Sequence, residues 1–172
     1  MKTTRILTAA FLLSGLCATA FADGPATKPA TEPLRYEVVQ IEGKVRVGPQ
    51  NDESLNTDAP GWFTPKVGDK LGGGIQIRVP LRSKIKLVAV PADPPTVLMI
   101  ESASTVSISE LAFKNGAATS RIKLGYGAIR AGVSEGATRS DMEIEAPSAT
   151  LSKRGTDIFR FEYHDGRFMM SL

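Results

Sequence analysis

Residues 75–90 read IQIRVPLRSKIKLVAV, and this stretch decides the fold class. Apolar residues occupy every second position in Ile75–Val79 and again in Ile85–Ala89, and Pro80 lies in the break between the two runs. A period of two places alternate side chains on opposite faces of an extended strand. The stretch therefore predicts two β-strands, each with one buried face and one wet face.

The same alternation recurs in short runs that are separated by Gly, Pro, Asn and Asp. The other runs lie in residues 36–47, 97–101, 106–108, 122–124, 129–133, 142–146 and 159–163. Together the runs predict an all-β domain of about ten short strands, arranged as a sandwich or barrel or as an irregular β-solenoid. Residues 110–113 are compatible with at most one helical turn, and no window of about ten or more residues has a helical stripe.

The first 22 residues have the three-part layout of a secretory signal peptide. A basic start with Lys2 and Arg5 precedes the apolar and small residues 6–19, and residues 20–22 form an A-x-A cleavage site. Cys17 follows Leu16, which disfavours a lipoprotein because its signal peptidase requires a small residue there. Cleavage after residue 22 predicts a periplasmic or secreted protein with no stable membrane span.

The segment after the cleavage site is expected to be a tether. Residues 23–33 read DGPATKPATEP and hold Pro, Ala and Thr without an apolar period, which predicts a flexible linker. The folded domain is then expected to span residues 34–172, and this length suffices for a core without disulfides or a metal.

Composition excludes several classes of function. The 172 residues contain one His and one Cys, and that Cys lies within the signal peptide. Zinc modules, disulfide scaffolds and His-dependent catalytic arrays are therefore disfavoured, and no cofactor is expected. Loss of Lys2 and Arg5 from the 21 basic residues leaves 19 against 18 acidic residues, so no nucleic-acid partner is expected.

Four residues are candidates for a contact surface. Arg82, Lys84 and Lys86 line one predicted strand face, which suits either an anionic envelope polymer or a solvated face that protects a sheet edge. Trp62 lies between Pro60-Gly61 and Pro65, where it is either a lid on the core or a stacking platform for a sugar or peptide.

Other patterns are more consistent with fold than with chemistry. The acidic alternation Asp141, Glu143 and Glu145 is expected to be solvated or to pair with the basic strand face, because one strand face cannot supply a calcium site. The Asp165-Gly166 pair predicts a type I′ hairpin turn. Ser120 and Lys123 have the spacing of a Ser-Lys pair but lie on a strand-like segment, and the glycines at 72–74 precede a strand, where no phosphate loop forms.

Several short motifs follow one another in a characteristic order. They are Glu42-Gly43-Lys44-Val45, Trp62, Val67-Gly68-Asp69-Lys70-Leu71, Leu124-Gly125-Tyr126-Gly127-Ala128-Ile129, Pro147-Ser148-Ala149 and Arg154-Gly155-Thr156. This order resembles the FecR domain family over about residues 37–166. Arg154-Gly155-Thr156 is the most specific part, and Gly155 is expected to adopt positive φ in a tight turn, with Arg154 either structural or facing a ligand.

The sequence also departs from the family pattern. Regulators of this family carry a cytoplasmic anti-sigma region before a membrane span, whereas five residues precede the apolar run here, so we expect no sigma-factor arm. The hairpin within residues 78–85 is expected to be altered. The chain stops soon after Gly166, where many relatives carry further strands, and the apolar tail 168–172 is expected either to pair inside the domain or to dock on a partner by strand addition.

The resemblance and the residues together predict an exported, non-catalytic binding module of the FecR type. It would act in the cell envelope through strand faces or edges, on a protein or a polysaccharide. The alternative is a periplasmic signalling component that relays the state of an outer-membrane receptor to a separate membrane or sigma-factor regulator. An enzyme is disfavoured because the sequence shows no triad and no convergent pair of carboxylates.

Overall fold

The computed structural model describes residues 33–50, 57–92, 95–114, 117–133, 139–154 and 157–172. Every regular element in these residues is a β-strand, so the all-β prediction is confirmed. In chain order the strands are β1 (Arg35–Glu42), β2 (Arg46–Pro49), β3 (Lys70–Leu71), β4 (Ile75–Val79), β5 (Lys84–Val90), β6 (Thr96–Ile100), β7 (Ser104–Lys114), β8 (Ala117–Val133), β9 (Arg139–Ala146), β10 (Ala149–Arg154), β11 (Asp157–His164) and β12 (Arg167–Ser171).

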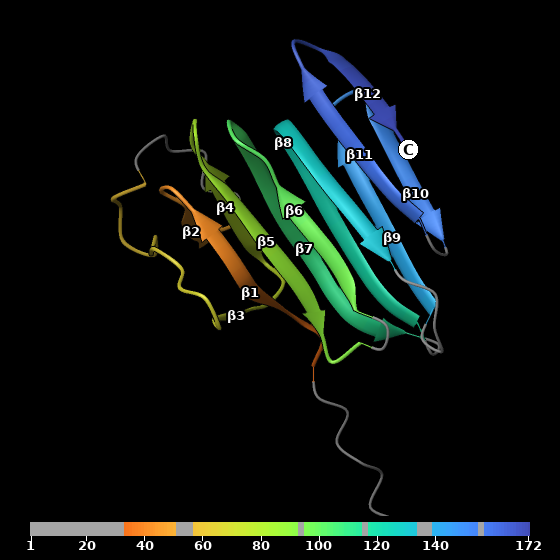
Figure 1. The fold of residues 1–172 in the computed structure, drawn as a ribbon, viewed down its shortest axis with the longest axis horizontal. Helices are drawn as coiled ribbons and strands as arrows, with labels where there is room; N and C mark the ends of the chain where they lie inside the picture. The colour runs from red at the N-terminus through yellow and green to blue at the C-terminus, as the bar shows by residue number, and fades with distance from the viewer. Residues whose placement is uncertain (1–32, 51–56, 93–94, 115–116, 134–138, 155–156) are drawn as a thin grey trace, which may run out of the picture. The chain divides into compact units, whose positions relative to one another are not determined.

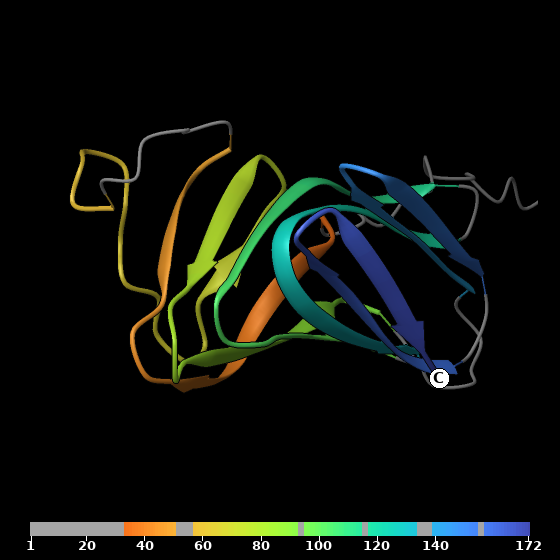
Figure 2. The same cartoon turned by 90° about the horizontal axis from the view of Figure 1, so that it is seen from above.

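The strands form one sheet that divides at β8 into two halves (Figure 1). Half A has the order β3-β1-β5-β6-β8-β11-β12, and half B has the order β2-β4-β7-β8-β9-β10. Neighbouring strands are antiparallel except β8 and β9, which are parallel. Figure 2 shows the sheet curled, so the fold corresponds to the barrel-like alternative and not to a solenoid of repeated turns.

The core lies between the two halves and is built by the predicted alternation. In β5 the side chains of Ile85 and Leu87 are fully buried, while the alternating Lys84 and Lys86 point outward. Half B contributes buried side chains such as Ile77 and Ile122 to the same core. Apolar burial from both halves therefore stabilises the curl, since neither half alone would cover its inner face.

A single strand joins the halves where the sequence predicts two. Residues 122–124 and 129–133 both belong to β8, whose first part pairs with β7 and β9 and whose last part pairs with β6 and β11. Between these parts Gly127 has φ +102°, and the Ser104 hydroxyl accepts a hydrogen bond from Ala128 N at 3.0 Å. The glycine lets β8 cross from half B to half A without ending.

Residues 110–113, for which the sequence allows at most one helical turn, form no helix. These residues extend β7, and Leu111 lies opposite Ser120 of β8. The weak helical pattern is overridden by the long β7–β8 hairpin, whose backbone hydrogen bonds supply partners for an otherwise ambiguous segment.

The apolar tail pairs within the domain. Strand β12 is antiparallel to β11, and the Phe168 ring stacks on the buried Phe161 ring with centroids 5.9 Å apart. The connection is the predicted tight turn, in which Asp165 and Gly166 both have positive φ, 50° and 76°. Of the two alternatives for the tail, the structure has internal pairing.

Candidate functional site

The outer face of half A carries a band of charged side chains. It crosses β1, β5, the end of β6, β8 and β11, which are hydrogen-bonded neighbours. We call this set the charged band; its members are Glu42, Lys84, Lys86, Glu101, Arg130, Arg160, Glu162 and His164. Every second side chain of a strand points away from the core, so residues far apart in sequence meet on this face.

The band begins at β1 and β5, where Glu42 lies opposite Lys84 in the sheet register. The Lys84 ammonium is 3.0 Å from a Glu42 carboxylate oxygen, and Gln40 donates a second hydrogen bond to the same carboxylate at 2.8 Å. The hydrogen bond from Lys84 lowers the pKa of Glu42. At neutral pH this end of the band is therefore a neutralised pair.

Glu101 is the centre of the band. Arg130 and Arg160 lie directly opposite each other on β8 and β11, an arrangement of like charges that is unfavourable by itself. The Glu101 carboxylate lies between them and accepts hydrogen bonds from Arg130 Nε at 2.7 Å and from Arg160 Nη2 at 2.8 Å. The hydrogen bond from Arg160 lowers the pKa of Glu101, so the carboxylate stays charged and holds both guanidinium groups in place.

The band ends on β11. Glu162 accepts a hydrogen bond from Arg160 Nη1, and its other oxygen is 3.0 Å from His164 Nε2. The Tyr126 ring meets His164 edge-on, with ring centroids 4.7 Å apart. The lone histidine thus lies at the end of the ion-pair network, in contact with Glu162. No group of three or more metal-ligating residues occurs in the part of the chain that the structure describes.

A shallow pocket of about 530 Å³ opens beside the Glu42 end of the band. Eight residues line it, and three are basic, two are acidic and three are uncharged: Arg82, Lys84, Arg130, Glu42, Glu101, Ser83, Met99 and Ser102. Both acidic groups are already held by basic members of the band. Arg82 makes no hydrogen bond or ion pair with any described residue and is exposed.

The predicted basic strand face is correct for two of its three residues. Lys84 and Lys86 point outward from β5, but Arg82 precedes the strand, in the turn between β4 and β5, with φ +58°. The hairpin within residues 78–85 is altered, as the sequence predicts: β4 and β5 do not pair with each other, because β4 pairs in half B and β5 in half A. The turn therefore links the two halves, and Arg82 enters the pocket from it.

Trp62 forms a buried lid over Gly48 of β2, outside the main core cluster, and not an open platform. Only 8% of its surface is exposed, and its ring packs against Gly48, where an added Cβ would lie 2.7 Å from Cε3. The Arg78 guanidinium carbon lies 4.5 Å from the ring centroid. With the ring buried and contacted by both Gly48 and Arg78, little of it is left for a ligand.

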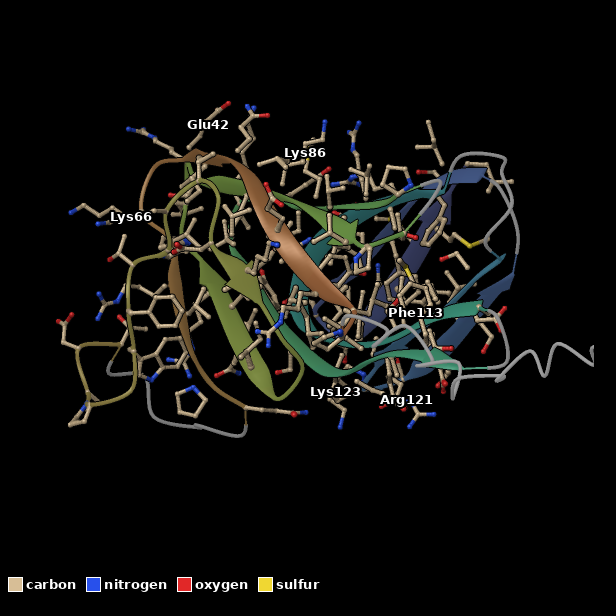
Figure 3. The ribbon with its side chains drawn as sticks, turned by 90° about the horizontal axis from the view of Figure 1, so that it is seen from below. Glu42, Lys66, Lys86, Phe113, Arg121 and Lys123 are labelled. Carbon is tan, nitrogen blue, oxygen red and sulfur yellow. The ribbon has the colours of Figure 1, made fainter. Side chains whose placement is uncertain are left out.

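The acidic alternation lies on the outer face of half B, so of its two predicted arrangements the pairing with the basic face of β5 does not occur. Instead Arg121 is 3.1 Å from Glu143, and Lys123 is 3.9 Å from Glu145, because β8 and β9 lie in parallel register. Figure 3 shows Arg121 and Lys123 on the side of the molecule opposite Lys86. On this face, basic side chains of β8 are paired with acidic side chains of β9.

The remaining sequence candidates are not part of the charged band. Gly155 and Thr156 lie outside the described residues, and Arg154 ends β10 opposite Asp141 with its side chain likewise undescribed. Ser120 is buried and Lys123 is exposed on the other face of β8, so they do not form a catalytic pair. Glycines 72–74 precede β4, which is a strand.

Sequence patterns did not reveal the centre of the band. Glu101 and Arg160 are 59 positions apart, and only the register of β6, β8 and β11 brings them together. The alternation in residues 129–133 and 159–163 did predict that Arg130 and Arg160 face outward.

Comparison with known proteins gives one match. A family model described as FecR protein matches residues 72–172, more than half of the chain. The chain belongs to the FecR protein family. The match covers β4 to β12 and so most of the charged band, whereas the predicted resemblance also took in residues 37–71. No curated protein and no solved structure gives a significant match.

Membership of the FecR family supports a FecR-like envelope or signalling module. Among the described residues, no helix has the length and apolarity needed to cross a membrane.

Proposed function

We propose that this FecR-family chain is an exported, non-catalytic interaction module of the cell envelope, and that the outer face of half A is its contact surface. The observation that carries the proposal is the difference between the two outer faces. On half B the cations Arg121 and Lys123 are matched by carboxylates of β9. On half A, Lys86 has no ion-pair partner among the described residues, and neither has Arg82 in the turn that leads into β5.

Rigid positioning supports the same surface. Glu101 holds Arg130 and Arg160 through short, charge-assisted hydrogen bonds, so the face is ordered before a partner arrives. A preorganised polar surface loses less conformational entropy on binding than a flexible one. Nothing in this arrangement requires a chemical step, which fits recognition better than turnover.

The second candidate is a signalling component that relays the state of an outer-membrane receptor. Family membership favours it, because the FecR family is one of signalling and regulation. In this version the same face of half A contacts the receptor or a separate membrane regulator. The two candidates differ in the partner's identity and not in the surface used.

Charge reversal on each outer face tests the proposal. Affinity-tagged Lys86→Glu and Lys123→Glu proteins are used to capture partners from envelope extracts, beside the parent. Both lysines point outward from central strands, so both variants are expected to fold, which circular dichroism checks. Lys86→Glu is expected to lose the parent's partner, and Lys123→Glu is expected to keep it.

Equal capture by both variants would contradict the surface assignment. Turnover of a glycan, peptide or ester by the purified protein, abolished by an acidic-residue substitution, would contradict the non-catalytic role.

A further inference from the structure

We infer that the pocket beside the β4–β5 turn binds carboxylate side chains of an acidic peptide segment on a protein partner, with Arg82 contacting the carboxylate. The inference rests on the proposed function and deepens it by naming the partner's chemistry. Its primary residue, Arg82, lies at the edge of the charged band and is not one of its members.

The Arg82 backbone is held in an unusual conformation by its neighbours. Its φ of +58° lies in the left-handed region, which is unfavourable for a non-glycine residue. The next residue, Ser83, is buried and accepts a hydrogen bond from Lys44 N at 3.0 Å. Gly43 packs so closely that a Cβ there would lie 2.9 Å from the Arg82 carbonyl oxygen. Glycine would fit the turn without strain, so the arginine side chain has a role that the fold does not require.

The pocket lining has an excess of positive charge, which favours an anionic ligand. Its carboxylates are neutralised within the band, Glu42 by Lys84 and Glu101 by Arg130. Arg82 remains uncompensated at the rim. A guanidinium group offers parallel N–H donors that match the two oxygens of a carboxylate, and such pairs are short and directional.

The lining favours a peptide over a sugar. Met99 is the one apolar residue of the lining, and methionine and arginine are both enriched at protein interfaces. None of the eight lining residues is aromatic, so the pocket has no ring on which a sugar could stack. A volume of about 530 Å³ accommodates a few side chains of an extended segment.

Replacing Arg82 by glycine separates binding from folding. Arg82→Gly removes the cation and also relieves the left-handed strain, so the melting temperature is expected to stay equal or to rise. A hexaglutamate peptide is titrated by calorimetry into the full chain at low salt, with an oligogalacturonate and inorganic phosphate as comparison probes. We expect the parent to bind hexaglutamate in preference to both, and Arg82→Gly to lose at least about tenfold in affinity, as expected for one charge-assisted contact.

Two variants control for the two effects of the substitution. Asp165→Gly relieves a left-handed residue, φ +50°, in the β11–β12 turn away from the pocket, and Lys123→Ala removes a cation from half B. Neither is expected to weaken hexaglutamate binding. Equal affinity of Arg82→Gly and parent would overturn the inference, and so would tighter binding of the uronate or of phosphate.

Envelope capture distinguishes failure of the inference from failure of the proposed function. If Arg82→Gly captures the parent's partner undiminished while Lys86→Glu does not, the inference is wrong and the proposed function stands. If the parent captures no partner at all, the proposed function fails as well.

Discussion

Gly127→Ala tests the crossing of β8 between the two halves. The added Cβ would lie 2.6 Å from the Ala103 carbonyl oxygen and from Ser104 Cα, and closer still to Ser104 Oγ. The φ of +102° adds backbone strain of about 1–3 kcal/mol. Displacing Ser104 also threatens its two hydrogen bonds with Ala128, each worth about 1 kcal/mol.

These contributions predict a loss of about 3 kcal/mol in the free energy of unfolding, or roughly 10 °C in melting temperature for a domain of this size. Urea titration and calorimetry measure the loss. The matched control is Gly125→Ala, two residues earlier in the same strand, where the added Cβ would meet nothing closer than 3.6 Å. This substitution is expected to change the free energy of unfolding by less than about 1 kcal/mol. Equal unfolding midpoints for the two variants would refute this account of the crossing.

Three further predictions concern buried and paired groups. Gly48→Ala is expected to push Trp62, the only tryptophan, from its site and shift its fluorescence to longer wavelength; unchanged emission contradicts the lid. Tyr36→Phe removes a buried hydroxyl that reaches no described residue with full hydrogen-bond geometry and interacts only weakly with the Ser120 side chain, so stability at pH 7 is expected to hold or to rise by up to about 1 kcal/mol. Burial raises the pKa of Tyr36 to about 12, so the parent is expected to lose stability between pH 10 and 12 while the variant loses less; parallel pH profiles would count against this. Glu101→Gln is expected to lower the free energy of unfolding at pH 7 by about 1 kcal/mol. This difference from the parent is expected to fade as pH falls through the lowered pKa of Glu101, because protonation then removes the parent's own charge. A difference that stays constant in acid would be inconsistent with the ion-pair network.

Local pattern was enough to predict which face of each strand is buried. Ile85 and Leu87 alternate with lysines in the sequence, and the structure buries the first pair and leaves the lysines outward. The Asp165-Gly166 turn was equally predictable, since its conformation depends on those two residues.

Pairing between distant segments was not predictable. The glycines around Tyr126 suggested a boundary between two strands, but Gly127 instead allows one strand to pair in both halves. The partner of Arg121 depends on the parallel register of β8 and β9, which no local pattern encodes. Arg82 looked like a strand residue by its spacing, and only packing of the turn against Gly43 fixes its left-handed backbone.

Site-specific crosslinking tests the central claim, that the outer face of half A is the contact surface of this envelope module. A photoreactive amino acid is placed at position 86 or, as a control, at position 123 on half B, and the full chain is irradiated in intact cells that express it. The account predicts a discrete adduct from position 86 and none from position 123. An adduct from position 123 alone, or none from either position, would contradict it.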